Sequence, residues 1–283
     1  MTMGEAATGN EQQIEYWNGR AGETWARSVE RIDRLMQPVT QALLERAAVR
    51  SGERVLDVGC GCGTTSLALA EAGGVVFGVD VSGPMVARAR ERAAGQGNPT
   101  FEVADAAAAK LERAYGLLFS RFGVMFFADP VAAFRHLGEA LVDGGRLCFA
   151  CWQPPKQNDW MSLAGQAVAP LLPPPETPPD PLAPGPFAFA DPGRLRFVLE
   201  QAGFVDVSLE DFRTKIHLGR DLDEAMDFQR DVGPVARALA ELEGDALERA
   251  IRLAREALAP HVTEKGLDLG AACWIATARV GRG

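Results

Sequence analysis

The sequence lacks the features that mark membrane proteins and nucleic-acid-binding proteins. No apolar segment follows Met1, and no apolar run approaches the roughly 20 residues that a helix needs to span a bilayer. The 29 basic residues are scattered among 38 acidic residues, giving a formal net charge of -9, whereas neutralising phosphates requires clustered Lys and Arg. We therefore expect a cytoplasmic protein that binds neither a membrane nor nucleic acid.

Cysteine is scarce as well, and the placement of the 5 cysteines argues against a metal site. The pairs Cys60-x-Cys62 and Cys148-x-x-Cys151 could together supply four thiolates to a zinc ion. However, Cys148 and Cys151 fall at an odd offset in one predicted strand, so they should project from opposite faces of the sheet. We therefore expect no metal, and we interpret the cysteines as small buried hydrophobic residues in a reducing compartment.

The most informative segment is residues 55–64, where an apolar strand leads through the alternate glycines Gly59, Gly61 and Gly63 into a helix. Glycine tolerates positive φ and lets the backbone approach a ligand, and the following helix offers unpaired N–H donors. A plain tight turn would also contain such glycines. A ligand site is favoured because the next apolar strand ends in Asp80, 21 residues after Gly59, where an acidic side chain suits ribose hydroxyls.

The glycine spacing separates two classes of nucleotide cofactor. The dinucleotide fingerprint is G-x-G-x-x-G. Counted from Gly59, Thr64 occupies the place of the third glycine, which stands one residue early at Gly63. The G-x-G-x-G form resembles the nucleotide loop of class I S-adenosylmethionine-dependent methyltransferases. The resemblance covers about residues 12–280 and is nearest to the small-molecule enzymes that are similar to ubiquinone/menaquinone methyltransferases.

The resemblance implies a set of residues that bind S-adenosyl-L-methionine. Asp57 matches the acidic residue before the loop, Asp80 the ribose-binding acid, and Asp105 with Ala106 the pair that contacts adenine. Tyr16, Trp17 and Trp25 would cover the methionine end of the cofactor, where an aromatic face attracts the sulfonium cation. The implied cofactor-binding residues are Tyr16, Trp25, Asp57, Gly59, Cys60, Gly61, Asp80, Val81, Met85, Asp105, Ala106, Ser120 and Arg121.

The alternation of apolar strands and helices predicts an α/β fold. The resemblance implies a doubly wound, mostly parallel seven-stranded sheet with an antiparallel last strand, here residues 272–280. The apolar pattern predicts two N-terminal helices, a strand at residues 205–212 and an amphipathic helical pair over about residues 222–258. The N-terminal helices and a helical and Pro-rich cap complete the expected fold, and we expect the two elaborations, the Pro-rich segment and the helical pair, to pack together. The expected parts are N-terminal helices covering the cofactor (1–50), a cofactor-binding core (51–153), a Pro-rich lid (154–190), and the rest of the core (191–283) with a helical insertion (221–264).

The Pro-rich segment has two interpretations. Residues 154–192 hold 12 of the 18 prolines, so we expect neither a helix nor a central strand there. A solvated linker would have a similar composition. Aromatic side chains in the segment favour a lid over the acceptor pocket, because they are costly to leave in water. The candidate pocket residues are Trp17, Phe126, Trp160, Phe187 and Phe189.

Methyl transfer requires few catalytic side chains, because the methyl group of a sulfonium is already activated. Proximity, orientation and exclusion of water accelerate it, with a base only where the acceptor must lose a proton. His217 and His261 are candidate bases, while Arg121 could hold an acceptor carboxylate or pair with an acidic side chain. We expect methyl transfer to a small-molecule acceptor. A non-methylation reaction on the same fold (decarboxylation, elimination or cyclisation) and a non-catalytic binding module remain alternatives.

Overall fold

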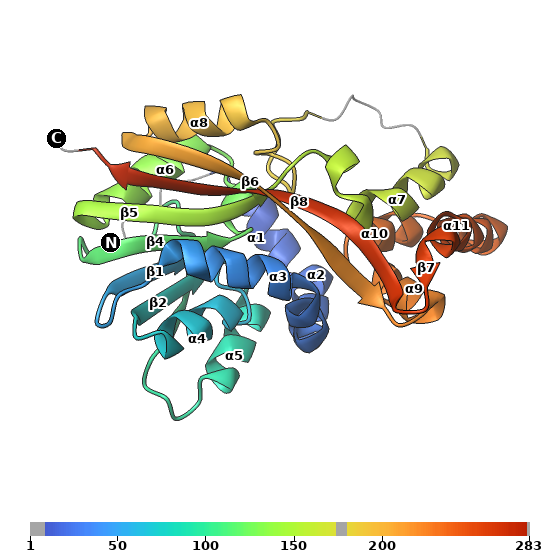
Figure 1. The fold of residues 1–283 in the computed structure, drawn as a ribbon, viewed down its shortest axis with the longest axis horizontal. Helices are drawn as coiled ribbons and strands as arrows, with labels where there is room; N and C mark the ends of the chain where they lie inside the picture. Colours follow the sequence, from blue (N-terminus) through green and yellow to red (C-terminus); the bar gives the residue numbers. More distant parts are fainter. Residues whose placement is uncertain (1–8, 174–179, 282–283) are drawn as a thin grey trace, which may run out of the picture.

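The computed structural model describes residues 9–173 and 180–281. Its centre is a sheet with the strand order β3-β2-β1-β4-β5-β8-β6, and a short β7 pairs with β8 (Figure 1). The strands are β1 (Arg54–Val58), β2 (Val75–Asp80), β3 (Thr100–Val103), β4 (Tyr115–Arg121), β5 (Leu141–Trp152), β6 (Phe204–Gly219), β7 (Val262–Thr263) and β8 (Gly266–Val280).

Strands β1 to β5 pair in parallel, and β8 runs antiparallel to both β5 and β6. The prediction of a mostly parallel sheet with an antiparallel last strand is therefore confirmed. The predicted number of seven strands omits only β7, a two-residue strand that forms a hairpin with β8 and makes the described sheet eight-stranded.

Helices cover both faces of the sheet, with α3, α4 and α5 on one face and α6 and α8 on the other (Figure 1). The α-helices are α1 (Glu11–Asn18), α2 (Arg20–Arg27), α3 (Val29–Ala47), α4 (Thr64–Glu71), α5 (Gly83–Arg92), α6 (Pro130–Glu139), α7 (Asp159–Val168), α8 (Pro192–Gln201), α9 (Leu222–Asp231), α10 (Pro234–Ala240) and α11 (Gly244–Leu258). Short 3-10 turns are Val124–Phe126, Pro155–Gln157, Ala169–Leu171 and Ala259–His261.

The core forms between these layers because the central strands are apolar on both faces, as expected of a parallel sheet covered by helices. The side chains of Leu56, Leu118, Phe119 and Phe149 are fully buried. Burying each such side chain contributes roughly 1.5–3 kcal/mol, so these strands fix the position of the loops at their ends. Several helices begin at side-chain caps, in which the acceptors Ser82, Asp129, Asp191 and Asp221 each receive a backbone N–H.

The N-terminal region forms three helices, whereas the sequence pattern predicted two. Gly19, in an extended conformation, separates α1 from α2. The chain then folds back so closely that a Cβ at Gly22 would lie 1.9 Å from the carbonyl oxygen of Trp17. A helical apolar pattern does not reveal such a break, because both short helices contribute to the same apolar stripe.

The expectation that the Pro-rich segment contains no helix was wrong. Helix α7 occupies the proline-free window between Pro155 and Pro170, so composition averaged over the whole segment concealed it. The helical insertion also differs, because Gly233-Pro234 and Gly244 divide the predicted pair into α9, α10 and α11. Part of the predicted lid, residues 174–179, lies outside the described residues.

Helix α7 packs against α10 and α11, and we call α7 with α9, α10 and α11 the cap (Figure 1). The buried Gln229 of α9 donates a hydrogen bond of 2.9 Å to the carbonyl oxygen of Trp160 in α7. Strands β6 and β8 extend beyond the predicted ranges of 205–212 and 272–280 and reach the cap. The two predicted elaborations are thus in contact with each other.

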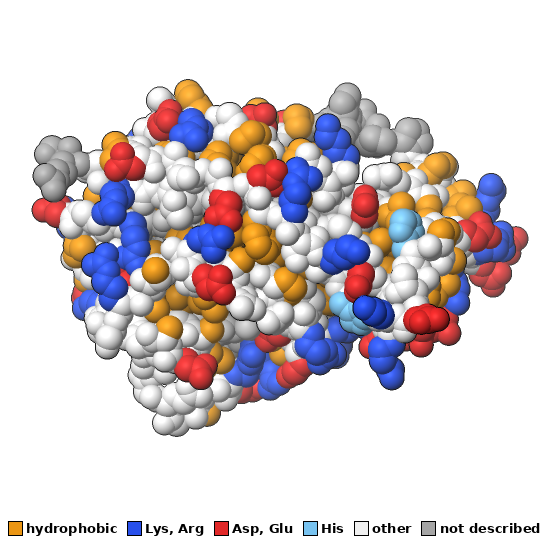
Figure 2. All heavy atoms as spheres, in the orientation of Figure 1, with side chains coloured by type: hydrophobic (Ala, Val, Ile, Leu, Met, Phe, Trp, Pro, Cys, Tyr) orange, Lys and Arg blue, Asp and Glu red, His pale blue; other side chains and the backbone are white. Residues whose placement is uncertain are grey.

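The surface shown in Figure 2 carries acidic and basic side chains interspersed with one another. Among the described residues, we find no helix whose length and apolar character would suit a bilayer crossing.

The packing of α7 predicts its hydrogen-exchange behaviour. We expect the amide protons of residues 163–168 to exchange in the ligand-free protein about as slowly as those of α11, because α7 is held by buried contacts. Hydrogen–deuterium exchange followed by mass spectrometry measures both segments in one experiment. Exchange of α7 as fast as that of an unstructured peptide would show that the segment is a solvated linker.

Candidate functional site

The predicted glycine turn connects β1 to α4 in a left-handed backbone conformation. The φ angles of Gly59, Gly61 and Gly63 are 67°, 53° and 80°. A Cβ at Gly59 would lie 2.6 Å from the Cα of Gly123, the second residue after β4. Both the conformation and the close approach exclude larger side chains. The turn therefore brings the backbone at the carboxyl end of β1 against the backbone at the carboxyl end of β4.

Asp80 ends β2 beside this turn, as the sequence predicted. One carboxylate oxygen accepts a hydrogen bond from the backbone N–H of Gly61 (2.8 Å), and the other accepts from the N–H of Ser82 (2.8 Å). Burial raises the pKa of Asp80, although backbone donors oppose this shift. The carboxylate thus couples the end of β2 to the glycine turn. Its contact with a cofactor ribose stays a prediction.

Asp57 lies beneath the turn rather than on its surface. Its side chain is fully buried, and Oδ2 accepts hydrogen bonds from the hydroxyls of Thr65 (2.7 Å) and Ser66 (2.6 Å) in the first turn of α4. Burial raises the pKa of Asp57 to about 6, while the two hydroxyls and the charge of Arg121 oppose the rise. The observed hydrogen bonds of Asp57 therefore hold the start of α4. A direct contact of Asp57 with the cofactor is implied only by the family resemblance.

Asp105 follows β3 and is held by a residue that the sequence analysis did not identify. The Asn10 side-chain amide nitrogen lies 3.0 Å from each Asp105 carboxylate oxygen, and its oxygen accepts from the N–H of Ala128 (2.8 Å). The neighbouring Ala106 is buried. Asn10 stands directly before α1, where the usual interpretation is a helix cap, so no local signal pointed to Asp105.

The aromatic residues predicted to cover the cofactor lie together. The ring centroid of Trp17 lies 5.2 Å from that of Tyr16, 5.8 Å from that of Trp25 and 5.4 Å from that of Phe126, each in an edge-to-face arrangement. Trp17 and Trp25 also pack against the small buried cluster of Val29, Cys62 and Met85. Helices α1 and α2 therefore bring aromatic side chains beside the glycine turn and α5. The backbone oxygen of Val81, another predicted cofactor residue, accepts from the side chain of Asn18 (2.8 Å).

Arg121 pairs with an acidic side chain, which was one of its two predicted roles. Its guanidinium donates to the hydroxyl of Thr40 (2.6 Å) and lies 3.9 Å from the carboxylate of Asp33. Asp33 also accepts from Thr64 (2.6 Å) and Arg92 (2.9 Å). The sequence pattern had pointed to neither Asp33 nor Arg92. Burial lowers the pKa of Arg121, whereas the nearby acidic charges raise it. This network fastens α3 to the glycine turn, α5 and β4.

Two other predicted cofactor residues, Ser120 and Cys60, are buried. The hydroxyl oxygen of Ser120 accepts from the N–H of Gly123 (3.1 Å), so it stabilises the turn after β4. All five cysteines are buried free thiols, and burial raises the thiol pKa of Cys62, Cys148 and Cys273 to about 12. Among the described residues, no group of His, Cys, Asp and Glu side chains could hold a metal ion.

The structure does not bring the three catalytic candidates together. Arg121 ends β4, whereas His217 lies near the far end of β6 and bonds Asp268 of β8 through Nδ1 (2.7 Å). The His217 side chain is half-exposed, and His261 is exposed after α11. The role of either histidine as a catalytic base stays a prediction.

The candidate acceptor-pocket residues occupy different environments. Phe126 contacts Trp17, and Phe187 is half-buried against the main core. Phe189 is 1% exposed, and its ring lies 6.1 Å from that of the buried Phe134. Phe189 is therefore part of the core beside α6, and its place in an acceptor pocket stays a prediction.

Trp160 lies beside an aromatic pair that the sequence analysis did not include. The rings of Phe122 and Trp152 stack with centroids 3.9 Å apart and an interplanar angle of 11°. The centroid of Trp160 lies 5.2 Å from that of Trp152. Phe122 directly follows β4, and Trp152 ends β5. These three residues therefore lie at the carboxyl ends of the strands next to the glycine turn.

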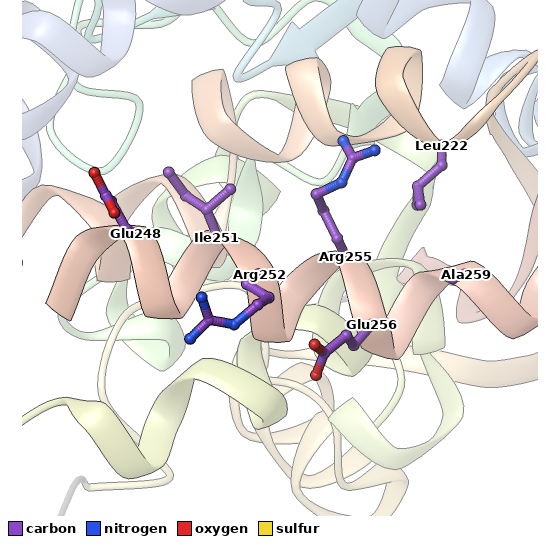
Figure 3. Close-up of a pocket in the computed structure, with 7 residues that line it drawn as sticks. All are labelled: Leu222, Glu248, Ile251, Arg252, Arg255, Glu256 and Ala259. Atoms are coloured by element: carbon purple, nitrogen blue, oxygen red, sulfur yellow. The ribbon is translucent and has the colours of Figure 1, made fainter. Parts of the chain in front are cut away.

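A separate shallow hollow of about 370 Å³ lies on the cap between α9 and α11 (Figure 3). Arg255 points toward α9, where its guanidinium forms an ion pair of 2.7 Å with Asp223. The lining residues are Leu222, Glu248, Ile251, Arg252, Arg255, Glu256 and Ala259. None of them belongs to the glycine turn, so this hollow is distinct from the predicted cofactor site.

Comparison with known proteins gives a family match for about a third of the chain. Residues 55–145 match the family described as "Methyltransferase domain". Phosphoethanolamine N-methyltransferase 1 of Triticum aestivum is 35% identical over 111 residues, which are 38% of this chain and 22% of that protein. Aklanonic acid methyltransferase DauC of Streptomyces sp. (strain C5) is 33% identical over 118 residues, 40% of this chain and 54% of that protein. The chain thus spans about half or less of the length of these relatives.

A similar solved structure covers almost the whole chain. Magnesium protoporphyrin IX methyltransferase (ChlM) from Synechocystis PCC 6803, crystallised with bound SAH, has a TM-score of 0.55 and 17% sequence identity, and covers 95% of this chain and 99% of that chain. At this identity the likeness concerns the fold, and it confirms the predicted class I arrangement of sheet and helices.

The buried carboxyl of Asp57 predicts a pH-dependent stability. Its folded-state pKa of about 6 lies above the usual value of 3.8, so the folded protein retains a proton that the unfolded chain releases. Stability from this group is therefore present below about pH 4 and is lost as the pH rises through 6. Asp57→Asn keeps an acceptor oxygen for Thr65 and Ser66 but does not titrate.

We expect the unfolding free energy of the wild type, relative to Asp57→Asn, to fall by on the order of 2–3 kcal/mol between pH 4 and pH 7.5. Urea unfolding of both proteins at the two pH values measures this difference. The same difference at both values would show that Asp57 has an ordinary pKa.

Proposed function

We propose that the chain contains a class I methyltransferase domain and acts through it. The protein transfers the methyl group of S-adenosyl-L-methionine to a nucleophilic atom of a small-molecule acceptor. The observation that carries this proposal is the glycine turn with its close backbone approach, coupled through Gly61 to the carboxylate of Asp80. Relatives named as phosphoethanolamine and aklanonic acid methyltransferases support methyl transfer, and they differ in the acceptor.

The residues at the strand ends fit this cofactor. The Asp80 oxygens each accept one backbone N–H, and a carboxylate oxygen can accept a second hydrogen bond, here from a ribose hydroxyl. Asp105 and Ala106 lie after β3, in the position that resembles the adenine-contacting pair. Trp17 and Trp25 lie beside the turn, where their rings would face the sulfonium.

When bound, the cofactor supplies an activated methyl group, and the protein contributes orientation and exclusion of water. Contacts between the N-terminal helices and the cap suit this purpose. Arg237 of α10 donates to the hydroxyl of Tyr16 (2.9 Å), and Arg31 of α3 bonds the carbonyl oxygen of Glu224 and lies over the ring of Phe228. We infer that residues 1–50 cover the cofactor, and that residues 154–190 and 221–264 cover the acceptor.

The buried free thiols also support a reducing, cytoplasmic compartment, where cysteines of this kind persist without disulfides.

The first functional prediction concerns cofactor choice. We expect the protein to bind S-adenosylmethionine or S-adenosylhomocysteine with a micromolar Kd and to show no affinity for NADH or NADPH, because the third glycine comes one residue too early for a dinucleotide turn. Isothermal titration calorimetry with each ligand measures this. Tight binding of either nicotinamide dinucleotide would contradict the proposed function.

The second functional prediction concerns Asp80. We expect Asp80→Ala to weaken S-adenosylhomocysteine binding by roughly 2–4 kcal/mol, because buried ribose hydroxyls would lose a charged acceptor. Asp129→Ala is the matched control, since Asp129 also accepts a backbone N–H, but at the start of α6. It should reduce stability by about 1 kcal/mol and leave affinity unchanged.

Calorimetry and thermal unfolding of both variants separate the two effects. Full affinity in Asp80→Ala, together with a strongly lowered Tm, would mean that Asp80 serves only to hold the turn.

A further inference from the structure

Three aromatic side chains lie in contact at the carboxyl ends of β4 and β5: Phe122 stacks on Trp152, and the tilted ring of Trp160 lies beside Trp152. We call these three residues the aromatic stack. Phe122 and Trp152 are parallel within 11° at 3.9 Å, and Trp160 of α7 follows at 5.2 Å and 57°. The stack adjoins the glycine turn, because Gly123, the residue after Phe122, lies against Gly59. It therefore lies in the half of the crevice that the cofactor residues leave to the acceptor.

The position of the Phe122 ring depends on an unusual backbone conformation. Its φ of 68° is left-handed, which costs a non-glycine residue roughly 1–3 kcal/mol. The backbone N–H of Phe122 nevertheless keeps its hydrogen bond to the carbonyl oxygen of Ala150 in β5 (3.1 Å). The surrounding structure thus holds Phe122 in a strained conformation that stacks its ring on Trp152, and such strain gathers at ligand sites.

The stack ends in a polar group without a partner. Trp160 is 8% exposed, and its indole N–H has no hydrogen-bond acceptor among the described residues. Ser162 Oγ and Gln153 Oε1 are likewise buried without a partner, so three of the five such side-chain atoms in the described residues lie within ten positions of sequence. Leaving a buried donor unpaired costs about 1–3 kcal/mol. In contrast, the indole N–H of Trp274 donates to the carbonyl oxygen of Ala190 (3.0 Å).

The basic residue next to the aromatic stack in sequence already has partners, so the stack itself offers an acceptor only aromatic surface and a neutral donor. Arg121, which precedes Phe122, is engaged by Thr40 and Asp33. The arginine side chains that lie over aromatic rings in the described part of the chain contact Phe228, Tyr115 and Tyr16, outside the stack. An acceptor phosphate would therefore find aromatic surface and a neutral donor where it needs a cation.

We propose that the acceptor is a planar, oxygen-bearing aromatic molecule that packs against the aromatic stack and accepts a hydrogen bond from Trp160 Nε1. This inference rests on the proposed function and names the substrate class for it. The partly exposed ring of Phe122 gives such a molecule an aromatic surface to pack against, and a ligand oxygen within reach of Trp160 satisfies the buried indole donor. Trp160 is then a substrate-binding residue, and Phe122 provides the wall nearest to the cofactor.

The test measures binding to the protein saturated with S-adenosylhomocysteine. Calorimetric titrations use 6,7-dihydroxycoumarin and 1,2-dihydroxyanthraquinone as planar aromatic probes, and phosphoethanolamine as the non-planar anionic comparison. We expect at least one aromatic probe to bind and phosphoethanolamine not to bind. Trp160→Phe keeps a ring and removes the N–H, and should weaken binding of the aromatic probe roughly 5–10-fold.

Trp274→Phe is the matched control, because it makes the same change at an indole whose N–H is already paired. It should lower Tm and leave the affinity for the probe unchanged. Phe122→Leu is a second test that removes the other end of the stack, and it should also weaken binding of the aromatic probe.

Binding of phosphoethanolamine in place of the aromatic probes, absence of binding by both aromatic probes, or wild-type affinity in both Trp160→Phe and Phe122→Leu would overturn the proposed acceptor class. The S-adenosylhomocysteine titration that precedes each experiment distinguishes the two proposals. Retained cofactor binding with failure of the aromatic probes removes only the acceptor class, whereas loss of cofactor binding in the wild type removes the proposed function as well.

Discussion

The site depends on one close approach between two backbones. Gly59, at the end of β1, and Gly123, just after β4, lie so near each other that a Cβ on either would be 2.6 or 2.7 Å from the other's Cα. This contact closes the floor of the crevice at the carboxyl ends of the parallel strands, where open α/β sheets bind their ligands. It also separates two halves, with Asp80 on the β2 side and the aromatic stack on the β4 and β5 side.

Polar contacts hold helix α3 against the backbone around the glycine turn. Asp33 of α3 accepts from Thr64 at the start of α4 and from Arg92 of α5, and it lies beside Arg121 of β4. Removing charges from water offsets much of the gain from pairing them, so such a network contributes more to position than to stability. It sets α3 relative to the glycine turn. Through Arg31 and Arg237, α3 and α1 also contact the cap, so the N-terminal helices and the cap share a boundary.

The sequence was sufficient for features set by local spacing. The glycine turn and the acidic end of β2 follow from short motifs, whereas the antiparallel last strand was implied by the family resemblance, and the structure has each of them. Features made by distant residues carried no such signal. The bond between Asn10 and Asp105 and the stack of Phe122 on Trp152 join residues 95 and 30 positions apart. Phe122 also adopts a left-handed conformation that no propensity favours.

Composition averaged over a long segment explains why helix α7 was not predicted. Counting prolines across residues 154–192 concealed α7, although the window between Pro155 and Pro170 has none. Aromatic content alone placed Phe189 in the pocket, yet an aromatic ring is as well suited to the core, where Phe189 packs on Phe134. The role of an aromatic residue in the Pro-rich segment can therefore be assigned only when its neighbours in the structure are known.

We propose that the glycine turn and the aromatic stack form the two halves of one active site. A crystal structure of the protein with bound S-adenosylhomocysteine would show whether they do. We predict the adenosine between Asp80 and Asp105, the amino-acid end beneath Trp17 and Trp25, and the sulfur facing Phe122 and Trp152. Binding of the ligand in the hollow between α9 and α11, or with its sulfur directed away from the aromatic stack, would show that the glycine turn and the aromatic stack do not form one active site.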